Sequence, residues 1–316
     1  MATVNTVTGP IDAGVLGFTL MHEHIYVLTE GMYQTFPHLW DREARTQKAA
    51  EQLAEAKAHG VDAMVDLTVL GLGRDVTLVR EAARRSGMQI IVATGLYTYD
   101  EVPRHFEHRD IDYMAGLFVR DIEQGIQGTD IRAAILKCAT DEKGPTPGVE
   151  KVLRAVARTQ RRTGVPISTH THAASERGLD QQRIFKEEGV DLSRVVIGHS
   201  GDTEDIVYLE KLIGAGSYIG MDRFGLHQML PTEKRVAVIA KLCERGYAGR
   251  MVLSHDTMCY IDWYPEEMRA ALPDYNYLHI PDAVVPALRA AGVSEEQVRT
   301  MTVDNPRAIF ERQGPY

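Results

Sequence analysis

The sequence predicts a (β/α)8 barrel, and three observations support that fold. Eight short strand-like runs alternate with segments of helical apolar spacing along the 316 residues. No glycine-rich phosphate loop follows the first run, although a nucleotide-binding open sheet would need one there. Polar, potentially reactive side chains end many of the runs, and a closed barrel gathers all strand ends over one mouth. We therefore expect one barrel domain over residues 1–316.

The predicted strands are short and rich in aliphatic and β-branched residues. In chain order they cover residues 18–25, 61–69, 88–97, 131–139, 165–172, 194–200, 217–222 and 251–256. Amphipathic helices are expected between them, for example over 49–60, 148–164 and 235–246. Several helices should end on a glycine, which tolerates the positive φ that closes a helix, at Gly60, Gly87, Gly164 and Gly216.

Composition narrows the class of protein. The chain is 44% hydrophobic and 25% charged, which is typical of a soluble globular enzyme. Its net charge of -9 argues against a nucleic-acid partner, and no apolar run is long enough to predict a membrane span. The three cysteines show no CxxC spacing, and we interpret them as reduced thiols of a cytoplasmic protein.

Two histidines end the first predicted strand, in the run Met21-His22-Glu23-His24. Because strand side chains alternate between faces, His22 and His24 point the same way and can hold one cation from one side. Taken alone the pair is ambiguous, since histidines at this spacing are also found as surface or hydrogen-bonded residues.

Later strands supply partners for this pair. His170 ends the fifth strand, His199 the sixth and Asp256 the eighth. In a barrel these ends converge, and neutral imidazoles with a carboxylate suit Zn, Mn, Co or Fe. Equivalent positions on so many strands favour a metal centre over a set of unrelated polar caps.

Lys137 lies in the apolar fourth strand, Ala133-Ala134-Ile135-Leu136-Lys137-Cys138-Ala139. A buried ammonium is costly, so this lysine must lose its proton, meet an anion or be modified, and a neutral amine can form a carbamate with CO2. The alternative is a lysine whose stem packs on the barrel while its head reaches the rim. The residues themselves leave both interpretations open.

This set of residues resembles the amidohydrolase superfamily, and longer motifs resemble its phosphotriesterase-like lactonases. The motifs are GFTLMHEHI, VDLTVLGLGRD, GLDQQRIFKEEGVD, VIGHSGDT, IGMDRFG and SHD, within a match from Gly9 to Phe310. The resemblance implies two divalent transition-metal ions (Zn, Co, Fe or Mn), bridged by a hydroxide and by Lys137 as an N6-carboxylysine. The more buried ion would be held by His22, His24 and Asp256, and the more exposed ion by His170 and His199.

The resemblance also implies the chemistry. The bridging hydroxide would attack the substrate, and Asp256 would collect its proton and pass it to the leaving alkoxide. Tyr97, at the end of the third strand, matches a family tyrosine that faces the metals, although its ring could simply pack with its hydroxyl in water. Arg223 matches an arginine of the lactonases, where the triesterase branch carries a histidine, although it could be a rim ion pair.

Two loops are expected to line the substrate pocket. Residues 257–280 are rich in large apolar side chains, including Met258 and Trp263, and we expect a lid or a dimer-contact surface there. A shorter loop over 224–233 would line the opposite side with Leu226 and Met229. The remaining loop histidines match no ligand position and are interpreted as solvated or hydrogen-bonded: His38, His105, His172, His227 and His255.

The leading functional hypothesis is a metal-dependent lactonase that opens N-acyl-homoserine lactones, and so quenches quorum signals, with promiscuous hydrolysis of organophosphate triesters. A dedicated phosphotriesterase (aryldialkylphosphatase) of the same fold is the first alternative. A non-catalytic metal-containing binding barrel is the second, and the completeness of the ligand set disfavours it. The resemblance also implies a homodimer.

Overall fold

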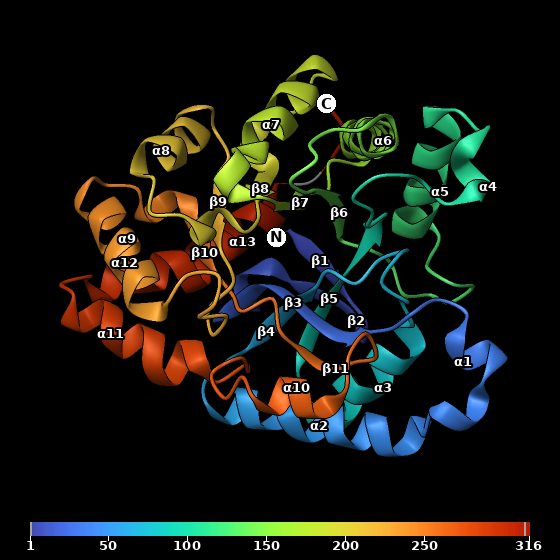
Figure 1. Cartoon of the computed structure of the whole chain (residues 1–316), viewed down its shortest axis with the longest axis horizontal. Coiled ribbons are helices and arrows are strands. Elements are labelled where there is room, and N and C mark those ends of the chain that lie inside the picture. The colour runs from blue at the N-terminus through green and yellow to red at the C-terminus, as the bar shows by residue number, and fades with distance from the viewer. Residues whose placement is uncertain (1, 313) are drawn as a thin grey trace.

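Eight parallel strands form the predicted barrel in the computed structural model, which describes residues 2–312 and 314–316 (Figure 1). Each strand pairs in parallel with the next one along the chain. All eight predicted strands are confirmed: β3 (Thr19–Val27), β4 (Ala63–Asp66), β5 (Gln89–Gly95), β6 (Ile135–Thr140), β7 (Ile167–Thr171), β8 (Val195–Ile197), β9 (Tyr218–Met221) and β10 (Met251–Leu253).

The eighth strand continues beyond β10 after a short interruption and closes the barrel. Strand β11 (Met258–Ile261) pairs in parallel with β3. Within the interruption, the N–H of Asp256 donates to the carbonyl of His22 at 3.0 Å, and the N–H of His24 donates to the carbonyl of Thr257 at 2.9 Å. Residues 257–280 are therefore not loop throughout, because they begin with a strand.

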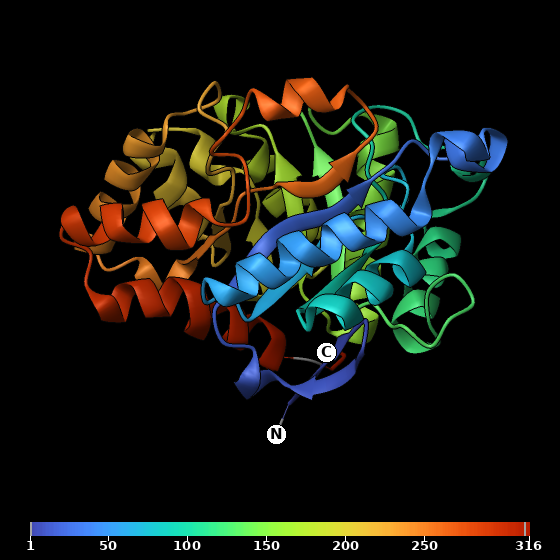
Figure 2. The same cartoon turned by 90° about the horizontal axis from the view of Figure 1, so that it is seen from below.

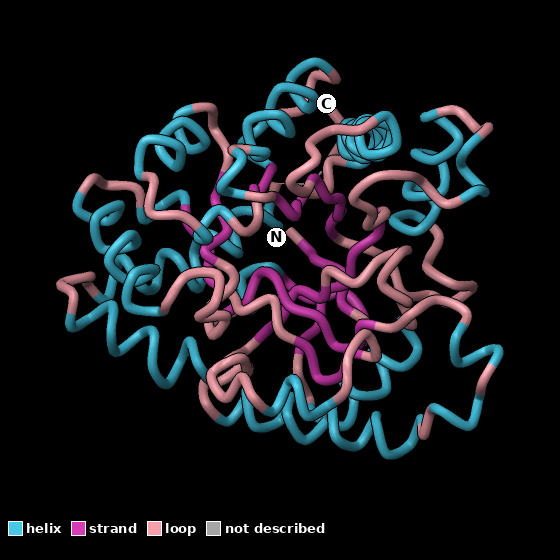
Figure 3. The backbone as a smooth tube through the Cα atoms, viewed as in Figure 1, coloured by secondary structure: helices cyan, strands magenta, loops and turns pink. Residues whose placement is uncertain are grey.

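Helices surround the barrel on the outside, as the tube in Figure 3 shows. The longer ones are α2 (Arg42–Ala58), α3 (Val76–Ser86), α5 (Ile111–Glu123), α6 (Pro147–Thr163), α7 (Arg177–Glu187), α8 (Ile206–Gly214) and α9 (Thr232–Glu244). Shorter ones are α1 (Met32–Thr35), α4 (Arg104–Glu107), α10 (Glu266–Ala270), α11 (Val285–Ala290), α12 (Glu295–Arg299) and α13 (Asn305–Glu311). Two π-helical turns cover Ile280–Val284 and Thr300–Asp304. Gly87 and Gly164 cap α3 and α6 with positive φ, as predicted, while Gly60 and Gly216 follow the caps of α2 and α8.

Strand residues divide between two buried layers by their parity. One set fills the barrel interior, for example Val65, Ile91, Ile135, Val196 and Val252. The other set packs against the helices, for example Met64, Ile90, Leu136, Ile197 and Leu253. Because alternate residues share a face, Lys137 lies on the interior side two residues after Ile135. The same parity places Asp222 on the side of Tyr218, which belongs to the interior cluster.

The two ends of the barrel carry different structures (Figure 2). An antiparallel hairpin of β1 (Thr3–Thr6) and β2 (Gly9–Asp12), which the sequence analysis did not predict, lies at one end near both chain termini. The segment that contains β11 and α10 lies at the other end, over the carboxyl ends of the strands. Among the described residues, no helix is both long and apolar enough to cross a membrane. Cys138, Cys243 and Cys259 are buried and free.

Asn305, at the start of α13, forms two hydrogen bonds to the backbone at the amino end of β10. Its side-chain amide donates to the carbonyls of Ala248 and Met251, at 2.8 Å and 2.7 Å. Both bonds are buried, so Asn305→Ala leaves two carbonyls without this donor and should lower the free energy of unfolding by about 1–3 kcal/mol. Urea denaturation measures the change, and a loss below about 0.5 kcal/mol, the range of a surface substitution, would contradict this role.

Candidate metal centre

The six predicted metal ligands meet at the carboxyl end of the barrel. Ligand atoms of His22, His199 and Asp256 lie within 4.8 Å of one another. A pocket of 420 Å³ opens above them, and His24, Lys137 and His170 also line it. The structure therefore brings together side chains that are far apart in the chain, as the barrel prediction requires.

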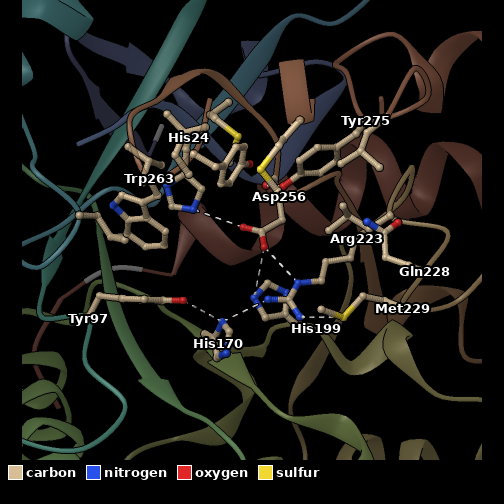
Figure 4. Close-up of a pocket in the computed structure, with 18 of the residues that line it drawn as sticks. His24, Tyr97, His170, His199, Arg223, Gln228, Met229, Asp256, Trp263 and Tyr275 are labelled. Atoms are coloured by element: carbon tan, nitrogen blue, oxygen red, sulfur yellow. Dashed lines mark hydrogen bonds and ion pairs between the residues drawn. The ribbon is translucent and has the colours of Figure 1, made fainter. Parts of the chain in front are cut away.

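Asp256 lies at the centre of this cluster (Figure 4). Its Oδ1 is 3.3 Å from Nε2 of His24 and 3.5 Å from Nε2 of His22. Its Oδ2 is 3.6 Å from Nε2 of His199, and Nε of Arg223 donates to the same oxygen at 3.1 Å. Three imidazole nitrogens thus converge on one carboxylate.

A second carboxylate, Asp222, lies beneath the cluster and orients two of the imidazoles. Its Oδ2 is 2.9 Å from Nδ1 of His22, and its Oδ1 is 2.9 Å from Nδ1 of His199. Because each Nδ1 carries the hydrogen of these bonds, each Nε2 is left unprotonated, and the Nε2 of His22 is the atom that Lys137 contacts. Two glycines leave room for the hydrogen bond between Asp222 and His22. A Cβ at Gly220 would lie 2.1 Å from Asp222 Oδ2, and one at Gly198 would lie 3.1 Å from His22 Nδ1.

The other two histidines are held in the same manner. Nδ1 of His24 is 2.8 Å from Oγ1 of Thr68, so its Nε2 faces Asp256. Nε2 of His170 is 2.9 Å from Asp141, so its Nδ1 is the atom that faces the pocket. Each of the four imidazoles therefore has one nitrogen held by a partner, as is typical of metal-ligating histidines. The second nitrogen faces Asp256 in His22, His24 and His199, whereas in His170 it faces Tyr97 and Arg223.

Lys137 is 1% exposed and reaches into the cluster. In the described part of the chain its Nζ makes one hydrogen-bonding contact, to Nε2 of His22 at 2.6 Å. Burial lowers the pKa of Lys137 to about 8, so the amine form is accessible near neutral pH. The lysine head group is therefore buried inside the barrel and does not reach the solvent at the rim.

The protonation states of three of the histidines and of Asp256 suit metal binding. Burial lowers the pKa of His170 to about 4 and lowers the pKa values of His199 and His22 as well. For Asp256, burial alone would raise the pKa, but the groups around its carboxylate, among them the Arg223 guanidinium, outweigh burial and hold the pKa well below its usual range. Neutral imidazoles around an ionised carboxylate form the donor set that a divalent transition metal requires.

Tyr97 and Arg223, the two other predicted site residues, both face the pocket. The hydroxyl of Tyr97 is 3.5 Å from Nδ1 of His170 and contacts the hydroxyl of Tyr99. Burial raises the pKa of Tyr97 well above 10, so it remains a neutral donor. Arg223 donates to Asp202 at 2.9 Å as well as to Asp256, so it is an inner ion pair rather than a rim pair.

The walls of the pocket are largely apolar. All four predicted loop residues line it: Met258 is buried, Leu226 is half-buried, and Met229 and Trp263 are 55% and 50% exposed. Four further residues line the pocket and were not predicted from the sequence: Val27, Leu72, Tyr99 and Gln228. The residues that orient the histidines, Thr68, Asp141 and Asp222, were also not predicted. Two of these residues could have been predicted from their spacing. Asp222 has the same strand parity as Tyr218, which faces the barrel interior, and Tyr99 follows the predicted site residue Tyr97 by two positions.

Burial of neutral histidines predicts a pH-dependent stability of the metal-free protein. The folded-state pKa values lie below the unfolded value of 6.5, so the unfolded chain binds more protons between pH 6.5 and about 4. Stability should therefore fall as pH decreases through this window, by up to about 1.4 kcal/mol per pH unit for each buried histidine. Urea melts of chelator-treated protein at pH 7 and pH 5 measure this, and equal stability at both would contradict it.

Comparison with known proteins agrees with this geometry. The model of the phosphotriesterase family matches residues 2–310. A phosphotriesterase homology protein of Mycobacterium tuberculosis is 57% identical over 100% of both chains, and an aryldialkylphosphatase of Saccharolobus solfataricus is 41% identical over 95% of this chain and 96% of its own. The solved structure of the phosphotriesterase from Mycobacterium tuberculosis superposes with a TM-score of 0.97, at 56% identity, over 99% of this chain and 100% of that one. The chain belongs to the phosphotriesterase family.

Proposed function

We propose that this protein is a metal-dependent lactonase that opens N-acyl-homoserine lactones and hydrolyses organophosphate triesters only slowly. The observation that carries the proposal is Arg223, which bonds to Asp202 and Asp256 inside a pocket with apolar walls. A guanidinium stays charged at neutral pH, so this position offers a fixed cation and cannot take up a proton as an imidazole would. The sequence resemblance implies an arginine at this position in the lactonases and a histidine in the triesterase branch, so Arg223 supports the lactonase.

The proposed centre would hold two divalent ions of zinc, cobalt, iron or manganese. His22, His24 and Asp256 would hold one ion, His170 and His199 would hold the other, and Lys137 as an N6-carboxylysine would serve both. The support is the donor set: neutral imidazoles with free nitrogens directed at one carboxylate, and a buried lysine with a lowered pKa. When bound, such ions polarise a carbonyl or phosphoryl oxygen and lower the pKa of water.

The side chains around these ions have separate tasks in the proposed reaction. Asp256 can receive the proton of the attacking water and transfer it to the departing alkoxide, because its carboxylate faces the pocket and is ionised. The neutral phenol of Tyr97 can donate to the oxygen of the substrate carbonyl. Arg223 holds Oδ2 of Asp256 through its Nε. The apolar walls with Leu226, Met258 and their neighbours suit an acyl chain.

A dedicated phosphotriesterase is the second candidate. It is favoured by the aryldialkylphosphatase of Saccharolobus solfataricus, which is 41% identical to this chain. Both reactions place oxyanion charge at the same position in the transition state, so one site can accelerate both to different degrees. The ratio of the two activities, rather than the presence of either, separates the candidates.

Comparison of kcat/KM for an N-acyl-homoserine lactone and for a dialkyl aryl phosphate tests the proposal, because this ratio measures differential transition-state binding. We expect the lactone to be preferred by about two orders of magnitude or more, which corresponds to about 2.7 kcal/mol. Asp256→Asn protein, prepared identically, controls for contaminating esterases. A preference for the triester by several orders of magnitude would establish the phosphotriesterase instead. If metal-loaded protein hydrolyses neither substrate, the non-catalytic binding barrel is favoured.

Four further features belong to the same proposal. We propose that residues 1–316 form one hydrolase domain, with residues 257–280 acting as a lid over the pocket. We also propose a homodimer in the cytoplasm. The support for the lid is that Met258, Ile261, Trp263, Tyr264, Met268, Leu272 and Tyr275 of this segment line the pocket.

A further inference from the structure

We propose that Glu23 is a positioning residue that sets the place of the Asp256 carboxylate by holding the backbone on both sides of it. Glu23 lies on β3 between His22 and His24, and strand alternation directs its side chain away from theirs. It is 0% exposed. The inference rests on the proposed function, because that function assigns Asp256 to metal binding and proton transfer.

The carboxylate of Glu23 accepts four hydrogen bonds from the interruption between β10 and β11. Its Oε1 accepts from the hydroxyl of Ser254 at 2.8 Å, from the N–H of His255 at 2.9 Å and from Nδ1 of His255 at 2.7 Å. Its Oε2 accepts from the N–H of Thr257 at 2.9 Å. A carboxylate offers about four acceptor positions, so these bonds can satisfy a buried anion. The donors belong to the two residues before Asp256 and the one residue after it.

Asp256 needs this support because its backbone is strained. Its φ is +59°, in the left-handed region that costs a residue with a side chain roughly 1–2 kcal/mol. Such a conformation persists when surrounding contacts over-determine it. Two of the Glu23 bonds fix the peptide N–H groups of His255 and Thr257, on either side of Asp256. The strained turn in turn directs the Asp256 carboxylate at the three imidazole nitrogens.

His255 connects Glu23 to the far end of the proposed lid through two hydrogen bonds. Its Nε2 accepts from the N–H of Ile280 at 3.0 Å, so its Nδ1 carries the hydrogen and donates to Glu23. The ring is 0% exposed and hydrogen-bonded, as one of the two sequence-based interpretations predicted. Thr257 and Ile280 begin and end the segment 257–280, so one carboxylate anchors both ends of that pocket wall.

Zinc affinity and turnover of Glu23→Gln test the proposal. The amide NH2 of glutamine is a donor and cannot accept a hydrogen bond. At least one of the four groups that donate to Glu23 would therefore lose its acceptor, and we expect the turn and the Asp256 side chain to shift. We expect zinc binding about tenfold weaker, the effect typical of an outer-shell partner, and a loss in kcat larger than the change in KM. Asn305→Ala is the matched control, because it loosens the same strand from its other end without touching the turn.

A double-mutant cycle separates positioning from general stability. If Glu23 acts through Asp256, Glu23→Gln should weaken zinc binding by no more than about twofold in an Asp256→Ala background. A full tenfold loss of zinc affinity in the Asp256→Ala background would overturn the proposal. So would a tenfold loss in Asn305→Ala, if its Tm falls by as much as that of Glu23→Gln. The zinc measurement needs no substrate, so a wild type that opens no lactone would refute the proposed function while this result still decides the role of Glu23.

Variants of His255 keep the test decisive if Glu23→Gln does not fold. The amide of His255→Asn can still donate to Glu23, whereas His255→Leu cannot. We expect His255→Leu to bind zinc about tenfold more weakly than wild type and His255→Asn to retain affinity within about threefold. Equal losses in the two variants, after correction for Tm, would contradict a role that depends on the bond to Glu23.

Discussion

The site depends on one buried carboxylate, Asp222, and the two imidazoles bonded to it. By accepting from Nδ1 of His22 and of His199, Asp222 leaves the Nε2 atoms of both rings unprotonated and facing Asp256. Burial would raise the pKa of Asp222, but His22 and its hydrogen bonds lower it, so the anion is maintained without solvent. The orientations of His22 and His199 are therefore set by hydrogen bonds within the protein.

Much of this arrangement could be predicted from the sequence because strand parity is a strong constraint. His22 and His24 two apart on one strand, and Lys137 two residues after an interior isoleucine, have their faces set by the period of two. Convergence of the other ligands followed from a closed barrel, since its strand ends share one mouth. The same parity would have identified Asp222, which lies in the interior layer.

The remaining features depend on contacts between distant segments and carry no local pattern. Strand β11 exists because it pairs with β3, more than two hundred residues away in the chain, whereas its composition indicates only an apolar segment. The left-handed turn at Asp256 depends on the carboxylate of Glu23 from another strand. Stability and function also diverge here, because buried neutral histidines and a strained turn cost free energy that the rest of the fold must offset.

The proposed metal centre would hold two ions with Lys137 between them. The most direct measurement is anomalous X-ray diffraction at the zinc edge from crystals grown with zinc. We expect two peaks at the mouth of the barrel, one beside His22, His24 and Asp256 and one beside His170 and His199, with extra density on Nζ of Lys137. A single peak, or two peaks with an unmodified Lys137 that contacts neither, would contradict the proposed centre.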